Sequence, residues 1–497
     1  MEHDTNLTRE LSEIAAALEA KAKTAGLDFY QTVFELVDYK QLNEIAAYGG
    51  FPTRYPHWRW GMEYEQLSKS YTYGLSVIYE MVINNDPCYA YLLRANSISS
   101  QKTVMAHVYG HADFFKNNAW FANTNRHMLD QMANHATVVR RLMNEVGHTE
   151  VENFIDICLS LENLIDIQSP FKAVTKILSI EDKEKLTQQP LNKLDSKPYM
   201  DKYVNPDSYM ESQRQKIIEF AKQKQNFPSE PTQDVLLFLI EYAPLTTWQK
   251  RILMILRDEA YYFAPQGQTK ILNEGWATYW HSKMMTSLHP LDASEIVDYC
   301  DQHAGVVSNH GGNLNPYRLG VELLRYIEER WDKGKFGIDY LHCDDPKVRD
   351  EWDTHAHLGK KKLFEVRSFH NDVTFIDEFL DEDFCHKTKM FLYEIDARSG
   401  KAVISTREFK DVKRQLLKQL TNFGNPLISV VDGNYKNRGE LLLLHKHDET
   451  DLKHEFTLET LKNIFLLWHR PVHLETVIEN VKRRVSFDGT NHAIEKI

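Results

Sequence analysis

Apolar residues recur at intervals of three and four through most of residues 6–387, and this spacing constrains the fold more than any other feature of the chain. It places apolar side chains on one face of successive α-helices. Residues 66–166 keep the pattern almost unbroken, apart from Asn85-Asp86-Pro87 and the neighbourhood of Gly147. Such helices must bury their apolar faces against one another. The sequence therefore predicts a mainly α protein with a large helical N-terminal domain over residues 1–387.

The pattern changes near residue 388. Short apolar runs typical of strands (KMFLYEI, KAVIS, PLISVV, ELLLLH and VHLETVI) alternate there with two helical segments. This order predicts a small C-terminal α+β module with an antiparallel sheet over residues 388–497. Residues 167–232 are polar and contain several prolines, which favours an exposed insertion or linker within the helical domain.

Acidic residues outnumber basic ones by 71 to 59, which gives a net charge of −12 over 497 residues. We expect no nucleic-acid partner, because binding to a phosphate backbone needs a concentrated basic face. The five cysteines are scattered and include no C-x-x-C pair, which indicates free thiols in a reducing compartment. The N-terminus does not have the pattern of a signal peptide, and no stretch of about 18 residues is apolar enough for a membrane span. We therefore expect a cytoplasmic protein.

His107 and His111 are four residues apart in the segment VMAHVYGHADFF. On a helix this spacing corresponds to about 400° of rotation, so both imidazoles project from one face, as the first two ligands of a helical zinc site do. Taken alone the pair is a weak signal, because 22 histidines in 497 residues produce about one such spacing by chance. Hydrogen-bonded core histidines are the alternative.

Glu274 and His281 are seven residues apart in ILNEGWATYWHSK, so they also share a helical face. Small residues between them leave room for an ion or a ligand. Two helices that each carry a pair of polar side chains on an inward-facing side, His107 with His111 and Glu274 with His281, favour one site that all four share. The three imidazoles of His107, His111 and His281 and the carboxylate of Glu274 predict a site for a divalent metal, most naturally zinc.

Glu259 lies on the apolar stripe of TTWQKRILMILRDEAYYF, three and four residues after Leu256 and Ile255. A carboxylate in that position should be paired, bound to a metal, or raised in pKa by desolvation. A raised pKa suits a general acid or base at neutral pH, which makes Glu259 a catalytic candidate. A salt bridge to a neighbouring arginine is the alternative.

Six segments resemble the successive signature blocks of the SpoVR (stage V sporulation protein R) family. They are INNDPCYAYLL, VMAHVYGHADFFKNN, PLTTWQKRIL, ILNEGWATYWHSK, NLNPYRLG and EVRSFHNDVTFIDEFLDEDF. The blocks occur in the family's order and span most of residues 25–395, and the C-terminal module resembles the family's C-terminal part. Several long blocks in register are far more specific than a single motif.

This resemblance implies a role in forming the spore cortex, a peptidoglycan layer. In relatives that make no spores it implies a role in starvation and stationary-phase physiology. It also implies a partner, a serine-kinase-like AAA+ protein that is often encoded beside the family's genes. It implies no settled biochemical activity.

By analogy, the H-x-x-x-H pair with a downstream glutamate also resembles zinc peptidases of the gluzincin type. That analogy makes His107, His111 and Glu274 the ligands, on a gluzincin-like helical pair. The residue after the first histidine, normally the catalytic glutamate, is Val108 here. A hydrolase would need its base from elsewhere, with Glu259 and His281 as candidates. A bound zinc would polarise a carbonyl and lower the pKa of a bound water.

Two main functions remain open. The first is a zinc-dependent, amidase- or peptidase-like hydrolase that acts on an amide or peptide bond in cell-wall precursor metabolism. The second is a non-enzymatic regulatory or scaffolding protein that binds a protein partner, which Val108, the acidic balance and the separate C-terminal module favour. A redox or oxygen-using metal protein is a third alternative.

Overall fold

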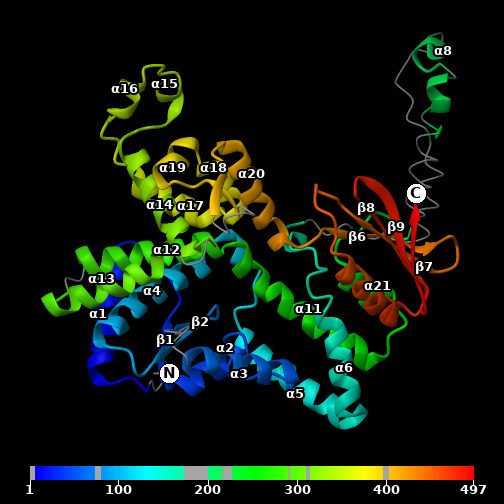
Figure 1. Cartoon of the computed structure of the whole chain (residues 1–497), viewed down its shortest axis with the longest axis horizontal. Helices are drawn as coiled ribbons and strands as arrows, with labels where there is room; N and C mark the ends of the chain where they lie inside the picture. The colour runs from blue at the N-terminus through cyan, green and yellow to red at the C-terminus, as the bar shows by residue number, and fades with distance from the viewer. Residues whose placement is uncertain are drawn as a thin grey trace. The chain divides into compact units, whose positions relative to one another are not determined.

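The computed structural model describes residues 6–72, 80–172, 200–206, 208–212, 214–215, 227–288, 291–308, 314–395 and 402–497 (Figure 1). The chain forms two compact units. The first unit comprises Met1–His148 and Tyr262–Gly424, and the second comprises Thr149–Tyr261 and Asn425–Ile497. Much of the predicted insertion at 167–232 lies outside the described residues. The predicted domain boundary between residues 387 and 388 stays a prediction.

Helices dominate the first unit, as the apolar periodicity predicts (Figure 1). Its centre is α12 (Lys270–Lys283), which packs against both α4 (Ile98–Asn117) and α14 (Pro316–Asp332). The other helices of this unit are α1 (Arg9–Thr24), α2 (Tyr39–Ala47), α3 (Trp58–Thr72), α5 (Met128–Val146), α13 (Ala293–Val307), α15 (Gly337–Leu341), α16 (Pro346–Asp350), α17 (Gly359–Phe369), α18 (Asp372–Phe379), α19 (Glu382–Thr388) and α20 (Phe409–Leu420). Among the helices of the described residues, none is long and apolar enough to cross a membrane.

Glycines let α12 approach its two neighbours closely. A Cβ atom added at Gly110 of α4 would lie 2.7 Å from the Cα of Ala277 in α12. A Cβ atom added at Gly275 of α12 would lie 2.5 Å from the Cα of Gly320 in α14. No side chain fits at such distances, so the backbones of the three helices are nearly in contact at these points. Between Ile271 and Ser282, every residue of α12 except Glu274 is buried.

The start of α12 is held by a residue from another helix. Asp372, the first residue of α18, accepts hydrogen bonds from the backbone N–H groups of Ile271 and Leu272 at 2.8 and 2.9 Å. These N–H groups have no partner within their own helix. Burial raises the pKa of Asp372 to about 7, although the two hydrogen bonds act in the opposite direction. The contact fixes α12 one turn before Glu274.

A three-stranded sheet in the first unit departs from the prediction of nearly continuous helix over residues 66–166. Its strands are β1 (Thr32–Val37), β2 (Glu80–Ile83) and β3 (Cys88–Leu93), in the order β1-β3-β2. The central strand β3 pairs in parallel with β1 and antiparallel with β2. Most of β3 is buried on both faces, so its apolar run does not alternate. Periodicity alone cannot distinguish such a run from a segment of buried helix. The first unit also holds a hairpin of β4 (Leu392–Ile395) and β5 (Ala402–Thr406).

The second unit contains the predicted C-terminal sheet, but this sheet is mixed rather than antiparallel. Its order is β10-β9-β8-β7-β6, with strands β6 (Ile428–Tyr435), β7 (Glu440–His445), β8 (Val472–Ile478), β9 (Val481–Phe487) and β10 (His492–Lys496). Strands β7 and β8 pair in parallel because α21 (His454–Trp468) lies between them and returns the chain in the same direction. Strands β9 and β10 were not predicted. The other described helices here are α6 (His148–Leu159), α8 (Asp201–Val204), α10 (Val235–Tyr242) and most of α11 (Thr247–Gln268).

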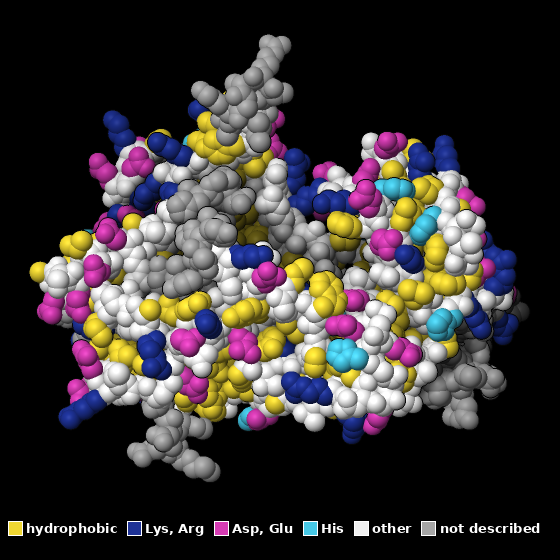
Figure 2. Space-filling model, turned by 60° about the horizontal axis from the view of Figure 1, so that its bottom comes forward, with side chains coloured by type: hydrophobic (Ala, Val, Ile, Leu, Met, Phe, Trp, Pro, Cys, Tyr) yellow, Lys and Arg dark blue, Asp and Glu magenta, His cyan; other side chains and the backbone are white. Residues whose placement is uncertain are grey.

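Charged side chains of both signs cover the surface. Figure 2 shows acidic and basic side chains intermingled across one face of the molecule. Among the described residues of that face, neither sign gathers into one large patch.

Replacing Gly110 by alanine should destabilise the first unit. The added methyl group would press against the backbone of Ala277, and overpacking of this kind lowers the free energy of unfolding by about 1–3 kcal/mol. Gly305 in α13 is the matched control, because a Cβ added there meets nothing within 4 Å. Gly305→Ala should raise the free energy of unfolding by up to about 1 kcal/mol through helix propensity. Denaturant titrations measure both effects, and equal changes in the two variants would contradict the packing argument.

Candidate metal centre

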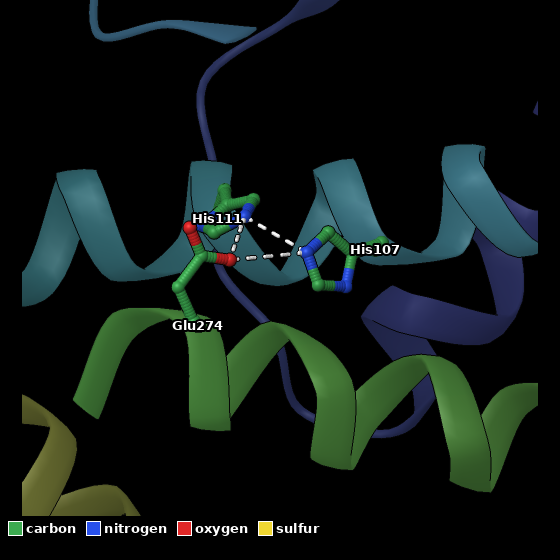
Figure 3. Close-up of side chains that lie close together, drawn as sticks. All are labelled: His107, His111 and Glu274. Carbon is green, nitrogen blue, oxygen red and sulfur yellow. Dashed lines mark hydrogen bonds and ion pairs between the residues drawn. The ribbon is translucent and has the colours of Figure 1, made fainter. Parts of the chain in front are cut away.

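Helices α4 and α12 bring three ligand atoms together. The Nε2 atoms of His107 and His111 lie 3.0 Å apart. Glu274 Oε2 lies 3.4 Å from His107 Nε2 and 3.3 Å from His111 Nε2. Figure 3 shows Glu274 rising from α12 toward the two imidazoles on α4. Three of the four predicted ligands therefore meet at one point.

These separations fit a divalent metal ion. Ligand atoms held tetrahedrally at the 2.0–2.1 Å typical of zinc lie about 3.3 Å from one another. Glu274 Oε2 is buried, and the described residues offer it no hydrogen bond of good geometry. Burying an ionised carboxylate oxygen without a hydrogen bond lowers the stability of the fold, unless a cation lies against that oxygen.

The hydrogen bonds behind His111 strengthen this conclusion. Its Nδ1 lies 2.9 Å from Asn273 Oδ1, an atom that can only accept a hydrogen bond. In neutral His111 the proton is therefore on Nδ1, and Nε2 presents a lone pair to Glu274 and His107. Lone pairs and a carboxylate facing one another repel, and a shared cation removes the repulsion.

The charge state of Glu274 also suits metal binding. Burial alone would raise the pKa of Glu274, but His111 and His107, when they carry a proton toward the carboxylate, outweigh burial through their charge and hydrogen bonds and hold the pKa well below its ordinary value. Glu274 is thus ionised at neutral pH. A metal ligand must be deprotonated, so this carboxylate is ready to bind.

His281 lies behind the ligands rather than among the three converging atoms. Its Nδ1 is 2.9 Å from Nδ1 of His107, the ring nitrogen that faces away from Glu274. Its Nε2 is 3.2 Å from Nδ1 of His303 in α13. Burial and the adjacent His107 and His303 lower the pKa of His281 well below its ordinary value, so the ring is neutral. The roles predicted for His281, as a ligand and as a catalytic residue, stay predictions.

Asn273 and His303 were not found by sequence reasoning. Asn273 is adjacent to Glu274, but its contact is to a histidine on another helix. His303 follows a polar part of α13 and forms no motif with the other histidines. A residue that hydrogen-bonds a histidine through the ring nitrogen facing away from the metal site can come from any helix that packs against that histidine. Its position in the sequence therefore follows no regular spacing from the histidine.

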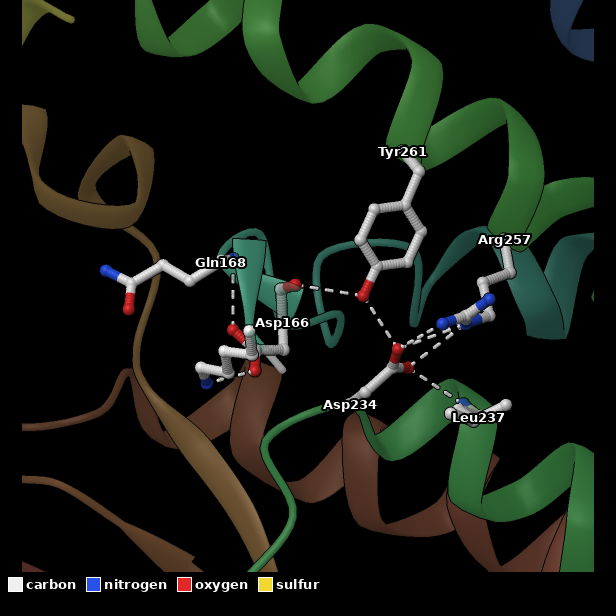
Figure 4. Close-up of polar contacts among 7 residues, drawn as sticks. Asp166, Gln168, Asp234, Leu237, Arg257 and Tyr261 are labelled. Atoms are coloured by element: carbon white, nitrogen blue, oxygen red, sulfur yellow. Dashed lines mark hydrogen bonds and ion pairs between the residues drawn. The ribbon is translucent and has the colours of Figure 1, made fainter. Parts of the chain in front are cut away.

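Glu259 belongs to α11 within the second unit, where its side chain is buried. The catalytic role predicted for it stays a prediction. Two nearby residues of α11 form a polar network within that unit (Figure 4). Arg257 Nη2 and the Tyr261 hydroxyl both donate to Asp234 Oδ2, at 2.6 and 2.7 Å. Asp234 Oδ1 accepts from the Leu237 backbone N–H and caps α10, so the network anchors α10 to α11.

Comparison with protein families agrees with the six sequence blocks. Residues 5–425 match the model described as SpoVR like protein, and residues 426–479 match the model described as SpoVR-like C-terminal domain. The chain belongs to the SpoVR family. A relative in Escherichia coli strain K12, the uncharacterized protein YcgB, is 28% identical over 488 residues, which cover 93% of this chain and 90% of YcgB. No solved structure matches the chain.

A cavity of about 370 Å³ reaches the candidate metal centre of this SpoVR-family protein. His111, Asn273 and Glu274 form one part of its wall. The rest of the lining is Val82, Phe115, Phe263, Gln266, Gly267 and Lys270. The volume lies within the range of about 300–1,000 Å³ typical of small-molecule sites. A small ligand in this cavity would contact the side of the centre formed by His111 and Glu274.

Purified wild-type protein should bind one zinc ion per chain, and His107→Ala or Glu274→Ala should abolish binding. His281→Ala should weaken affinity by about 10–100-fold, because the partner of a ligand's second nitrogen orients the ring. His386→Ala is the control, since His386 lies on the surface of α19. Elemental analysis and competition with a chelator measure these effects. A wild-type protein that stays free of metal in zinc-replete buffer would contradict the assignment.

Proposed function

We propose that this SpoVR-family protein is a metal-dependent hydrolase that cleaves an amide or peptide bond. The observation that carries the proposal is the convergence of His107, His111 and Glu274 beside a cavity of small-molecule size. Zinc bound by two imidazoles and one carboxylate, with a further position open, is the arrangement of catalytic rather than structural zinc.

A zinc ion bound here would polarise a carbonyl group and lower the pKa of a bound water to about 7. The residues of the chain would supply the rest. Glu274 and the two imidazoles would hold the ion, while His281 and Asn273 would orient the imidazole rings. Phe115 and Phe263 line the cavity with apolar surface and would limit the access of bulk water. His281 remains the proposed source of a general base.

The family supports a substrate in the cell wall. Formation of the spore cortex, which the family's name implies, involves peptidoglycan, whose peptides are joined by amide bonds. An amidase or peptidase acting on small peptidoglycan precursors would fit both this role and the size of the cavity. Zinc as the metal is part of the proposal.

One observation favours the alternative of a non-enzymatic regulatory protein. Val108 occupies the position at which zinc peptidases carry their catalytic glutamate, and it is completely buried. A metal centre without that group could bind a ligand or stabilise a surface for a protein partner, for which a serine-kinase-like AAA+ protein is the proposed candidate. Capture of such a partner equally by wild-type protein and by Glu274→Ala, with no hydrolysis by either, would favour this function.

Hydrolysis should depend on the metal. Zinc-loaded protein incubated with N-acyl amino acids and with short peptides of the peptidoglycan stem should release primary amines, measured with a fluorogenic amine reagent. Chelation should abolish release and added zinc should restore it, because the ion supplies the water of lowered pKa. Glu274→Gln should match the buffer blank, and His386→Ala should match wild type. Release that survives chelation would rule out the proposed chemistry.

A further inference from the structure

The polar lining of the cavity is asymmetric. Glu274 and His111 lie at the metal centre, and Lys270 is the one cation among the described residues that line the cavity. Gln266 and Asn273 add neutral amides, and the remaining side chains are apolar. A single cation beside an apolar surface and a metal centre indicates a ligand that carries a negative charge at a defined distance from its reacting group.

The position of Lys270 is electrostatically unfavourable for the fold itself. It is the first residue of α12, where the helix dipole presents its positive end. Asp372 is close enough to attract Lys270, but its two carboxylate oxygens accept from the N–H groups of Ile271 and Leu272. Of the residues that the structure describes, none forms an ion pair with Lys270. Among the described residues, the ammonium group of Lys270 therefore has no carboxylate paired directly with it.

The distance between Lys270 and the metal centre limits the ligand. Lys270 and Glu274 are four residues apart on α12, so they lie on the same face of the helix, about 6 Å apart along its axis. In an N-acyl amino acid or the C-terminal part of a peptide, three bonds separate the carbon of the amide carbonyl from the carbon of the free carboxylate. A carbonyl at the centre would then place that carboxylate within reach of the flexible Lys270 side chain.

We propose that Lys270 binds the free carboxylate of the substrate, so that the centre cleaves the amide bond next to a terminal carboxylate. Substrates of this class are N-acyl amino acids and small peptides with a free C-terminus. The proposal rests on the proposed hydrolase function and names its substrate class. Val82, Phe115 and Phe263 would contact the apolar parts of the substrate, and Lys270 would set its direction in the cavity.

The test uses binding of two hydroxamates to the zinc-loaded full chain. Succinic acid monohydroxamate has a carboxylate three bonds from its hydroxamate carbonyl, and its terminal amide is the same size without the charge. Isothermal titration should give about tenfold tighter binding of the acid than of the amide by wild type, at the low end of a charge-assisted hydrogen bond. Lys270→Met should remove this preference, and Lys270→Arg should retain it.

Lys360→Met is the matched control, because Lys360 is an exposed lysine near the start of α17 and does not line the cavity. It should keep the preference of wild type for the acid. Equal affinities for the two probes in wild type, or an unchanged preference in Lys270→Met, would overturn the role of Lys270.

The outcome separates this role from the hydrolase function. Amide hydrolysis without any preference for a free carboxylate would leave the hydrolase standing and overturn the assignment of Lys270. A preference lost in Lys270→Met, in a protein that hydrolyses no N-acyl amino acid or peptide, would support Lys270 as a carboxylate site and overturn the hydrolase.

Discussion

The close approach of α12 to α4 and α14 is the constraint on which the rest of the first unit depends. At Gly110 against Ala277, and at Gly275 against Gly320, the helix backbones lie so near each other that no larger side chain fits. Imidazole and carboxylate side chains are short, so His107, His111 and Glu274 can share one point only when their helices lie this close. Interiors of such density are not continuously deformable, which keeps the ligand atoms in place.

A second set of contacts determines how the buried imidazole rings and the start of α12 are oriented. Each ligand histidine uses one ring nitrogen toward Glu274 and the other toward a fixed partner, which is His281 for His107 and Asn273 for His111. Asp372 holds the start of α12 by two backbone hydrogen bonds. Because both ring partners lie on α12, the helix that packs against α4, and Asp372 lies on α18, the orientation of the rings is a property of the packed core. The candidate metal centre is thus held in one arrangement by its surroundings.

Much of this arrangement could be predicted from the sequence, and the failures have identifiable causes. Helical spacing placed His107 with His111, and Glu274 with His281, on shared faces, because such spacing is a local property. Which ring nitrogen each histidine turns toward Glu274 depends on packing, so the sequence could not place His281 behind His107. The sequence predicts helix where β3 forms, because an apolar strand buried on both faces has no alternation. The parallel pairing of β7 with β8 depends on where α21 crosses, which local patterns do not encode.

The burial of Val108 shows how this centre differs from a zinc peptidase. Val108 packs in the apolar core with no exposed surface, so a glutamate there would be desolvated rather than aimed at a bound water. The chain instead places polar groups behind His107 and His111 and places Lys270 in the cavity wall. Asn273 and neutral His281 orient the imidazoles and so favour a fixed geometry around a bound ion. Lys270 in the cavity wall favours one direction for a ligand in the cavity. Chemistry at such a centre would depend on the ion itself and on how the ligand is held, more than on an adjacent carboxylate base.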